Sequence, residues 1–202
     1  MTGLIFGPPD AEAWHLCIDM QRIFLEPGDW YCPAGLEILP AIRRLAAHAP
    51  KRSAFTRFIT PATPEEAEGR WQHFYRHWSG VTRSALGDEV LELHADLLPL
   101  TVPERVIDKI THNAFDSAAF EAFVARTRPS ALILTGVETD VCVLATALSA
   151  VDRGIRVIVV SDAVASSDRA SHQACLDLVY PRYDQQIEQV TCEDLLASGW
   201  PS

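Results

Sequence analysis

The sequence predicts a three-layer α/β/α domain around a mostly parallel sheet of about six strands, with a Rossmann-like topology. Short apolar runs alternate with amphipathic helical patterns along the chain. The longest of these runs are largely apolar rather than alternating, which indicates strands that are buried on both faces, as in a parallel sheet between helix layers. The 202 residues are expected to form one domain over residues 1–202.

Several segments match buried strands. Residues 131–134 are entirely apolar, and residues 14–18 form a buried run that Asp19 closes. Residues 53–55 begin a weaker run. In chain order, the expected strands are residues 14–18, 53–55, 105–107, 131–134, 155–160 and 187–190.

Helical patterns separate these strands. The plainest helix start has Thr63 as the N-cap, Pro64 at the first helical position, and Glu65 and Glu66 in the first turn. Residues 79–104 are less regular and are expected to form a lid or an edge segment. The expected helices are residues 35–47, 64–78, 117–126, 140–153 and 168–179.

Charge and cysteine content exclude several classes of protein. With 17 Lys and Arg against 27 Asp and Glu, the net charge is −10 at pH 7, so nucleic acid and anionic membranes are not expected as partners. The apolar runs are too short to span a membrane, and the N-terminus shows no secretory signal. Five cysteines without a C-x-x-C pair suggest neither a disulfide framework nor a structural zinc site, and a cytoplasmic location is expected.

Polar residues at strand ends are the candidates for chemistry, because ligands of such sheets bind at the carboxyl ends of the strands. Asp19 follows the first expected strand, Lys109 the third, and Cys142 lies one turn into the helix after the fourth. The amides and the dipole of a helix start favour a thiolate at Cys142. No histidine is obviously placed to act as its base, so Asp19 is the expected proton acceptor and Lys109 balances the charge. Taken singly, each of the three residues also fits a purely structural role.

Three segments resemble the isochorismatase-like cysteine hydrolases, a superfamily that includes nicotinamidases, N-carbamoylsarcosine amidohydrolases, biuret hydrolases and ureidoacrylate hydrolases. The resemblance covers the chain from about residue 13 to 191. The segments are Leu16-Cys17-Ile18-Asp19-Met20-Gln21, Val106-Ile107-Asp108-Lys109 followed by Asn113-Ala114-Phe115, and Gly136-Val137-Glu138-Thr139-Asp140-Val141-Cys142-Val143.

The resemblance implies roles for individual residues. Asp19, Lys109 and Cys142 would form a catalytic triad. The peptide bond before Glu138 is expected to be cis, with the amides of Glu138 and Cys142 forming an oxyanion hole. Substrate-pocket residues are expected among the aromatic side chains and after the third strand, where Asn113 replaces a serine common in the family. The expected pocket residues are Phe24, Trp71, Trp78, Asn113 and Phe115.

The sequence departs from the metal-dependent nicotinamidases. Those enzymes carry an Asp and two His after the second strand, whereas residues 56–61 contain no histidine. His73 and His77 are four residues apart, but no Asp or Glu lies between them, so two surface histidines are the plainer interpretation. We expect neither a metal ion nor another cofactor.

The expected activity is hydrolysis of a C–N bond in a small amide, ureide or carbamoyl compound through a thioester on Cys142. One alternative is an isochorismatase-type vinyl-ether hydrolase, which needs no thiol nucleophile. Another is a non-catalytic binding or scaffold protein with the same fold. Four aromatic side chains of residues 64–78 form a broad stripe, which, with the superfamily resemblance, predicts a homodimer or homotetramer.

Overall fold

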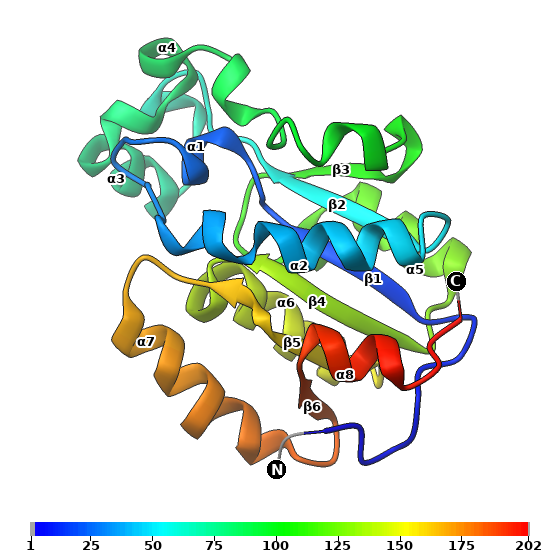
Figure 1. The fold of residues 1–202 in the computed structure, drawn as a ribbon. Coiled ribbons are helices and arrows are strands. Elements are labelled where there is room, and N and C mark those ends of the chain that lie inside the picture. The colour runs from blue at the N-terminus through cyan, green and yellow to red at the C-terminus, as the bar shows by residue number, and fades with distance from the viewer. Residues whose placement is uncertain (1–2, 202) are drawn as a thin grey trace.

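The computed structural model describes residues 3–201, and its centre is a sheet of six parallel strands. The strand order is β3-β2-β1-β4-β5-β6 (Figure 1), which confirms the expected fold class. The order reverses direction between β1 and β4, the place where open α/β sheets bind ligands. The strands are β1 (Trp14–Ile18), β2 (Ser53–Phe58), β3 (Val106–Lys109), β4 (Ala131–Val137), β5 (Arg156–Ala165) and β6 (Ile187–Val190).

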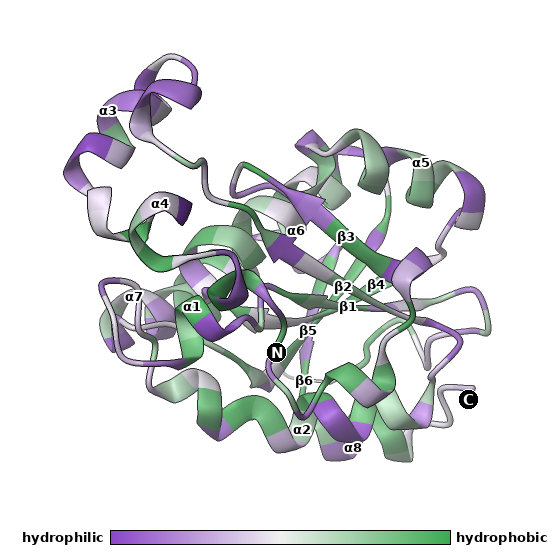
Figure 2. Ribbon diagram, turned by 90° about the horizontal axis from the view of Figure 1, so that it is seen from above, coloured by the Kyte–Doolittle hydropathy of each residue, from purple (hydrophilic) through white to green (hydrophobic). Residues whose placement is uncertain are grey.

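Two pairs of helices form the outer layers (Figure 1). Helices α2 (Ala34–His48) and α8 (Cys192–Ala197) cover one face of the sheet, and α5 (Ala118–Thr127) and α6 (Leu144–Asp152) cover the other. The central strands are coloured hydrophobic in Figure 2, as burial on both faces requires. Within residues 3–201, no helix combines the length and the hydrophobicity needed to cross a membrane.

Four strands continue beyond their apolar runs, and one of these is β3, which ends at Lys109. In β2, the parallel pairing with β3 continues to Phe58 opposite Lys109, and Arg57 forms an ion pair with Asp108 on the neighbouring strand (2.8 Å). Strand β4 continues to Val137 and β5 to Ala165. Backbone pairing, and not side-chain hydrophobicity, determines where these strands end. Hydrophobic runs alone therefore underestimate the length of the strands.

Three expected helices are not continuous α-helices. The helix expected at residues 140–153 begins with a wide turn (Thr139–Val143) and continues as α6. Residues 64–78 form a short turn (Pro64–Glu66) and then α3 (Arg70–His77), because Gly69 between them has a φ of 55° that a helix does not accept. Thr63 occupies the N-cap position, but its side chain makes no capping hydrogen bond. The expected helix 168–179 is α7 (Arg169–Ala174), which continues as a wider turn (Cys175–Val179).

The irregular segment 79–104 contains short helical turns, among them α4 (Arg83–Leu86), and no strand. It lies with α1 (Arg22–Leu25) and α3 near the carboxyl end of β1 (Figure 1). The buried Gln21 fixes it there, because its amide donates to the carbonyl oxygens of Phe58 (3.1 Å) and Leu91 (2.6 Å). The segment thus covers the edge of the sheet at which Asp19 lies.

Candidate active site

Close contact between β1 and β4 brings two predicted site residues together. Gly136 has a φ of 105°, and a Cβ at this position would collide with the backbone of Ile18 on the neighbouring strand. Glycine therefore allows the end of β4 to lie directly against the end of β1. Asp19 follows β1 and Cys142 follows β4, so both lie at the point where the strand order reverses.

Asp19 is held by a buried ion pair and a hydroxyl group. The Lys109 Nζ lies 2.7 Å from Asp19 Oδ2, and the two residues are 2% and 0% exposed. The Thr56 hydroxyl donates to Asp19 Oδ1 (2.6 Å) and accepts the backbone N–H of Asp19 (3.2 Å). Lys109 also donates to the carbonyl oxygen of Thr111 (3.0 Å) and lies 4.7 Å above the Phe58 ring. Both carboxylate oxygens are therefore fixed in direction.

Cys142 is electrostatically coupled to this ion pair. Burial raises the pKa of the Cys142 thiol, and the Asp19 carboxylate raises it further, while Lys109 opposes both. Burial acts to lower the pKa of Lys109, but Asp19 and Cys142 outweigh it, so this pKa lies above its ordinary value. A raised pKa favours the thiol over the thiolate, so a base beside Cys142 would assist its attack.

Hydrogen bonds hold the turn that contains Cys142 in place. The peptide bond between Val137 and Glu138 is cis, which confirms the sequence expectation. The Glu138 carbonyl accepts the amides of Val141 and Val143 (both 3.1 Å), and its carboxylate accepts the amide of Ser167 (2.8 Å). Residues Thr139–Val143 form a single wide helical turn before α6. These bonds fix the backbone on both sides of the cysteine.

His112 is the site residue that the sequence analysis missed. Its Nδ1 lies 3.9 Å from Cys142 Sγ, although no histidine had been expected near the thiol. The ring stacks on Phe58 (centroids 6.0 Å apart, 26° between planes) and contacts Trp71 (4.8 Å). Burial, and then the charge of Lys109, lowers the pKa of His112. Its position three residues after Lys109, in a loop at the same edge of the sheet, was the available signal.

The Cys142 side chain lies on the wall of a cavity of about 370 Å³, and most of the other lining residues are aromatic. Phe24 and Trp78 belong to its lining, whereas Trp71 lines two other hollows. Asp29 and Glu138 are the acidic side chains of the lining, and among residues 3–201 no lysine or arginine side chain belongs to it. The described lining residues are Phe24, Asp29, Trp30, Phe58, Phe74, Trp78, His112, Glu138, Val141, Cys142 and Ser167.

Two expected pocket residues lie elsewhere. The Asn113 side chain accepts the amide of Phe115 (3.0 Å) and donates to Asp116 (3.0 Å), so it caps the turn Ala114–Asp116. Phe115 is buried against Phe120, with Arg153 4.3 Å above its ring. Neither residue belongs to the described lining of the cavity, because Asn113 caps this turn and the Phe115 ring packs against Phe120 of α5.

The metal-ligating side chains do not form a cluster. Across residues 3–201, no three His, Cys, Asp or Glu side chains are placed to hold one ion. His73 and His77 are exposed on α3, on the wall of a separate outer hollow.

A parallel α/β domain in which a thiol, a carboxylate and a lysine meet below an aromatic cavity has the framework of a small-molecule hydrolase. The sequence model of one protein family, described as the Isochorismatase domain, matches residues 13–191 of this chain. The chain therefore belongs to the isochorismatase family of hydrolases.

Individual relatives agree with this assignment. An uncharacterised isochorismatase family protein, PncA, of Bacillus subtilis (strain 168) is 34% identical over 92 residues, which cover 43% of this chain and 50% of that protein. The match thus spans half the length of that relative. Among solved structures, an isochorismatase family protein from Desulfovibrio vulgaris subsp. vulgaris str. Hildenborough has a TM-score of 0.76 at 23% identity, covering 92% of this chain and 98% of that one. N-carbamoylsarcosine amidase from Thermoplasma acidophilum has a TM-score of 0.69 at 19% identity, covering 92% and 97%. These structures share the fold.

Proposed function

We propose that this family hydrolase cleaves the C–N bond of a small amide, ureide or carbamoyl compound through a thioester on Cys142. The observation that carries the proposal is the buried Asp19–Lys109 ion pair, which lies at the same edge of the sheet as the Cys142 thiol on the wall of the cavity. A vinyl-ether hydrolase needs no such thiol, and a scaffold protein needs no charged pair at this site.

The first half of the reaction forms the thioester. Asp19 accepts the proton of the Cys142 thiol, and the thiolate attacks the substrate carbonyl carbon. The amides of Glu138 and Cys142 receive the oxyanion that develops on the carbonyl oxygen. Lys109 keeps Asp19 oriented and offsets the negative charge. Asp19 then returns the proton to the leaving nitrogen, so that an amine or ammonia departs as the C–N bond breaks.

The second half hydrolyses the thioester. A water molecule attacks the same carbonyl carbon, the C–S bond breaks, and the acid product leaves while Cys142 regains its proton. The same amides stabilise the second tetrahedral intermediate. Cys142 and Asp19 thus return to their starting protonation states at the end of the cycle.

The cavity chemistry favours a neutral or cationic substrate. Aromatic walls provide stacking surface, and a volume of about 370 Å³ fits a small molecule. Asp29 and Glu138 would repel a carboxylate, and Lys109 is already paired with Asp19. Isochorismate carries two carboxylates, so the vinyl-ether alternative has less support. The amidase with the same fold agrees with C–N hydrolysis.

A panel of neutral, cationic and anionic amides and ureides, assayed for ammonia or amine release, tests the proposal. Cys142→Ala should abolish turnover of any substrate found, and mass spectrometry of the wild type should detect an acyl group on Cys142. Cys175→Ala is the matched control, because Cys175 is also buried but lies outside the cavity lining. Comparable kcat in Cys142→Ala would refute the thioester mechanism.

A further inference from the structure

We propose that His112 is the general base for the second half of the reaction, in which it activates the water that hydrolyses the Cys142 thioester. This inference rests on the thioester function proposed above. It assigns different bases to the two steps: Asp19 for the thiol and His112 for the water.

The first support is the position of the imidazole. His112 Nδ1 lies 3.9 Å from Cys142 Sγ, and both side chains line the same cavity. An acyl carbon bonded to Sγ would lie within reach of one water molecule held by Nδ1, the separation that general-base catalysis requires. Phe58 and Trp71 hold the ring in this orientation through their contacts.

The second support is that Asp19 is poorly placed for the water. Asp19 is fully buried and does not belong to the described lining of the cavity. Thr56 engages one of its carboxylate oxygens and Lys109 the other. A water molecule that enters the cavity therefore meets His112 before it meets Asp19.

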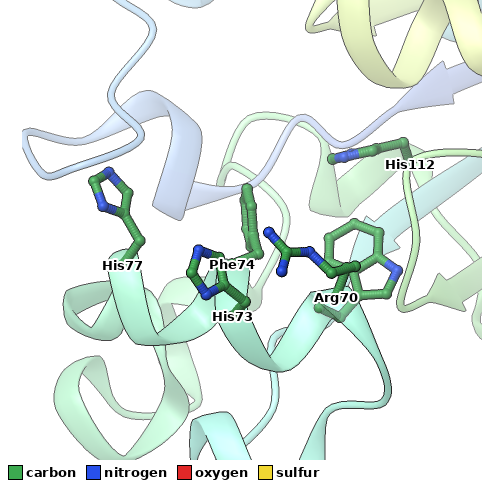
Figure 3. A pocket seen from close by; sticks show the side chains of 6 residues that line it. Arg70, His73, Phe74, His77 and His112 are labelled. Atoms are coloured by element: carbon green, nitrogen blue, oxygen red, sulfur yellow. The ribbon is translucent and has the colours of Figure 1, made fainter.

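The third support is the access of water to His112. The residue also lines an outer hollow of about 450 Å³, together with Arg70, Trp71, His73, Phe74 and His77 of α3. Figure 3 shows the His112 ring directed from its loop towards these side chains. Water can reach the imidazole from this hollow while the substrate occupies the inner cavity. Burial lowers the pKa of His112, which keeps the ring neutral and able to accept a proton near pH 7.

The proton balance of the step is complete. The water oxygen forms a bond to the thioester carbon, and its proton passes to Nδ1 of the tautomer that carries hydrogen on Nε2. Collapse of the tetrahedral intermediate breaks the C–S bond. The departing sulfur takes the proton from Nδ1, so the thiol and the neutral imidazole are both restored and the acid is released.

p-Nitrophenyl acetate separates the two steps, because nitrophenolate appears when Cys142 is acylated and turnover then depends on deacylation. In His112→Gln, we expect a burst rate within twofold of the wild type. The steady-state rate should fall at least 100-fold, and acetyl-Cys142 should accumulate in intact-mass spectra. Imidazole should restore the steady-state rate of His112→Ala, which a purely structural role would not allow. His73→Gln is the matched control, because His73 lines only the outer hollow, and it should leave both phases unchanged.

The outcomes are distinguishable. A steady-state rate of His112→Gln within twofold of the wild type would overturn the assignment of His112 and leave the thioester mechanism intact. A slowed burst would also overturn it, because His112 would then serve the thiol. If the wild-type enzyme acquires no acetyl group on Cys142, the proposed function fails, and this inference fails with it.

Discussion

Replacing Thr56 with valine tests whether one hydroxyl group orients the carboxylate of the site. The Thr56 hydroxyl donates to Asp19 Oδ1 (2.6 Å) and accepts the Asp19 amide (3.2 Å), and both residues are fully buried. Valine has nearly the same shape, so the substitution removes the two hydrogen bonds without opening a cavity. It leaves the carboxylate with Lys109 as its remaining partner.

The magnitude follows from the two bonds. A hydrogen bond to a charged group contributes about 1.5–3 kcal/mol, and a buried amide without a partner costs about 1–3 kcal/mol. The added methyl group offsets about 0.8 kcal/mol. We therefore expect Thr56→Val to lower the free energy of unfolding by about 2–5 kcal/mol. If the carboxylate bond is also lost from the transition state, kcat/KM falls about 10- to 100-fold.

Urea unfolding and steady-state kinetics measure these two effects. Thr60→Val is the matched control, because the Thr60 hydroxyl is also buried but has no hydrogen-bond partner within residues 3–201. It should change the free energy of unfolding by less than about 1 kcal/mol. Equal effects of Thr56→Val and Thr60→Val would refute the reasoning, since burial alone would then account for the loss.

Three further predictions concern acid stability, metals and assembly. Burial lowers the pKa of His15 to about 3, whereas an unfolded histidine titrates near 6.5. On acidification, the unfolded state therefore binds a proton at His15 before the folded state does. The free energy of unfolding should fall by about 2 kcal/mol between pH 7 and pH 5 because of His15, and His15→Gln should remove this part of the loss. Chelation of divalent metals should leave activity unchanged, because residues 3–201 contain no three-ligand cluster. Light scattering should give a dimer or tetramer of the 22.3 kDa chain, and Trp78→Ala should alter both assembly and KM.

Each of these predictions has an outcome that contradicts it. Equal acid sensitivity of the wild type and His15→Gln in urea unfolding would show that His15 does not titrate as proposed. Activity lost on chelation and restored by zinc or iron would make His73 and His77 candidate ligands. A scattering mass equal to that of the monomer would exclude the oligomer at the concentration used.

The local pattern of the sequence was sufficient for the fold class and for choosing three candidate site residues. The expected strands at residues 14–18 and 187–190 have the same bounds as β1 and β6, although His15, Glu188 and Gln189 are buried polar residues within them. Asp19, Lys109 and Cys142 became candidates because each stands at or just after a strand, where a parallel sheet places its functional side chains. The resemblance to a known family led to the prediction of the cis peptide bond between Val137 and Glu138, which the structure contains.

The partners of those residues depended on the tertiary structure. Thr56 lies 37 positions from Asp19, and His112 lies 30 positions from Cys142. Strand register places Thr56 beside the carboxylate, and the course of the loop after β3 places His112 beside the thiol. Asn113, the next residue in that loop, turns away from the cavity to cap a helical turn. Sequence periodicity records how each residue is buried within its own element, whereas a side chain's neighbours are set by how distant elements pack against one another.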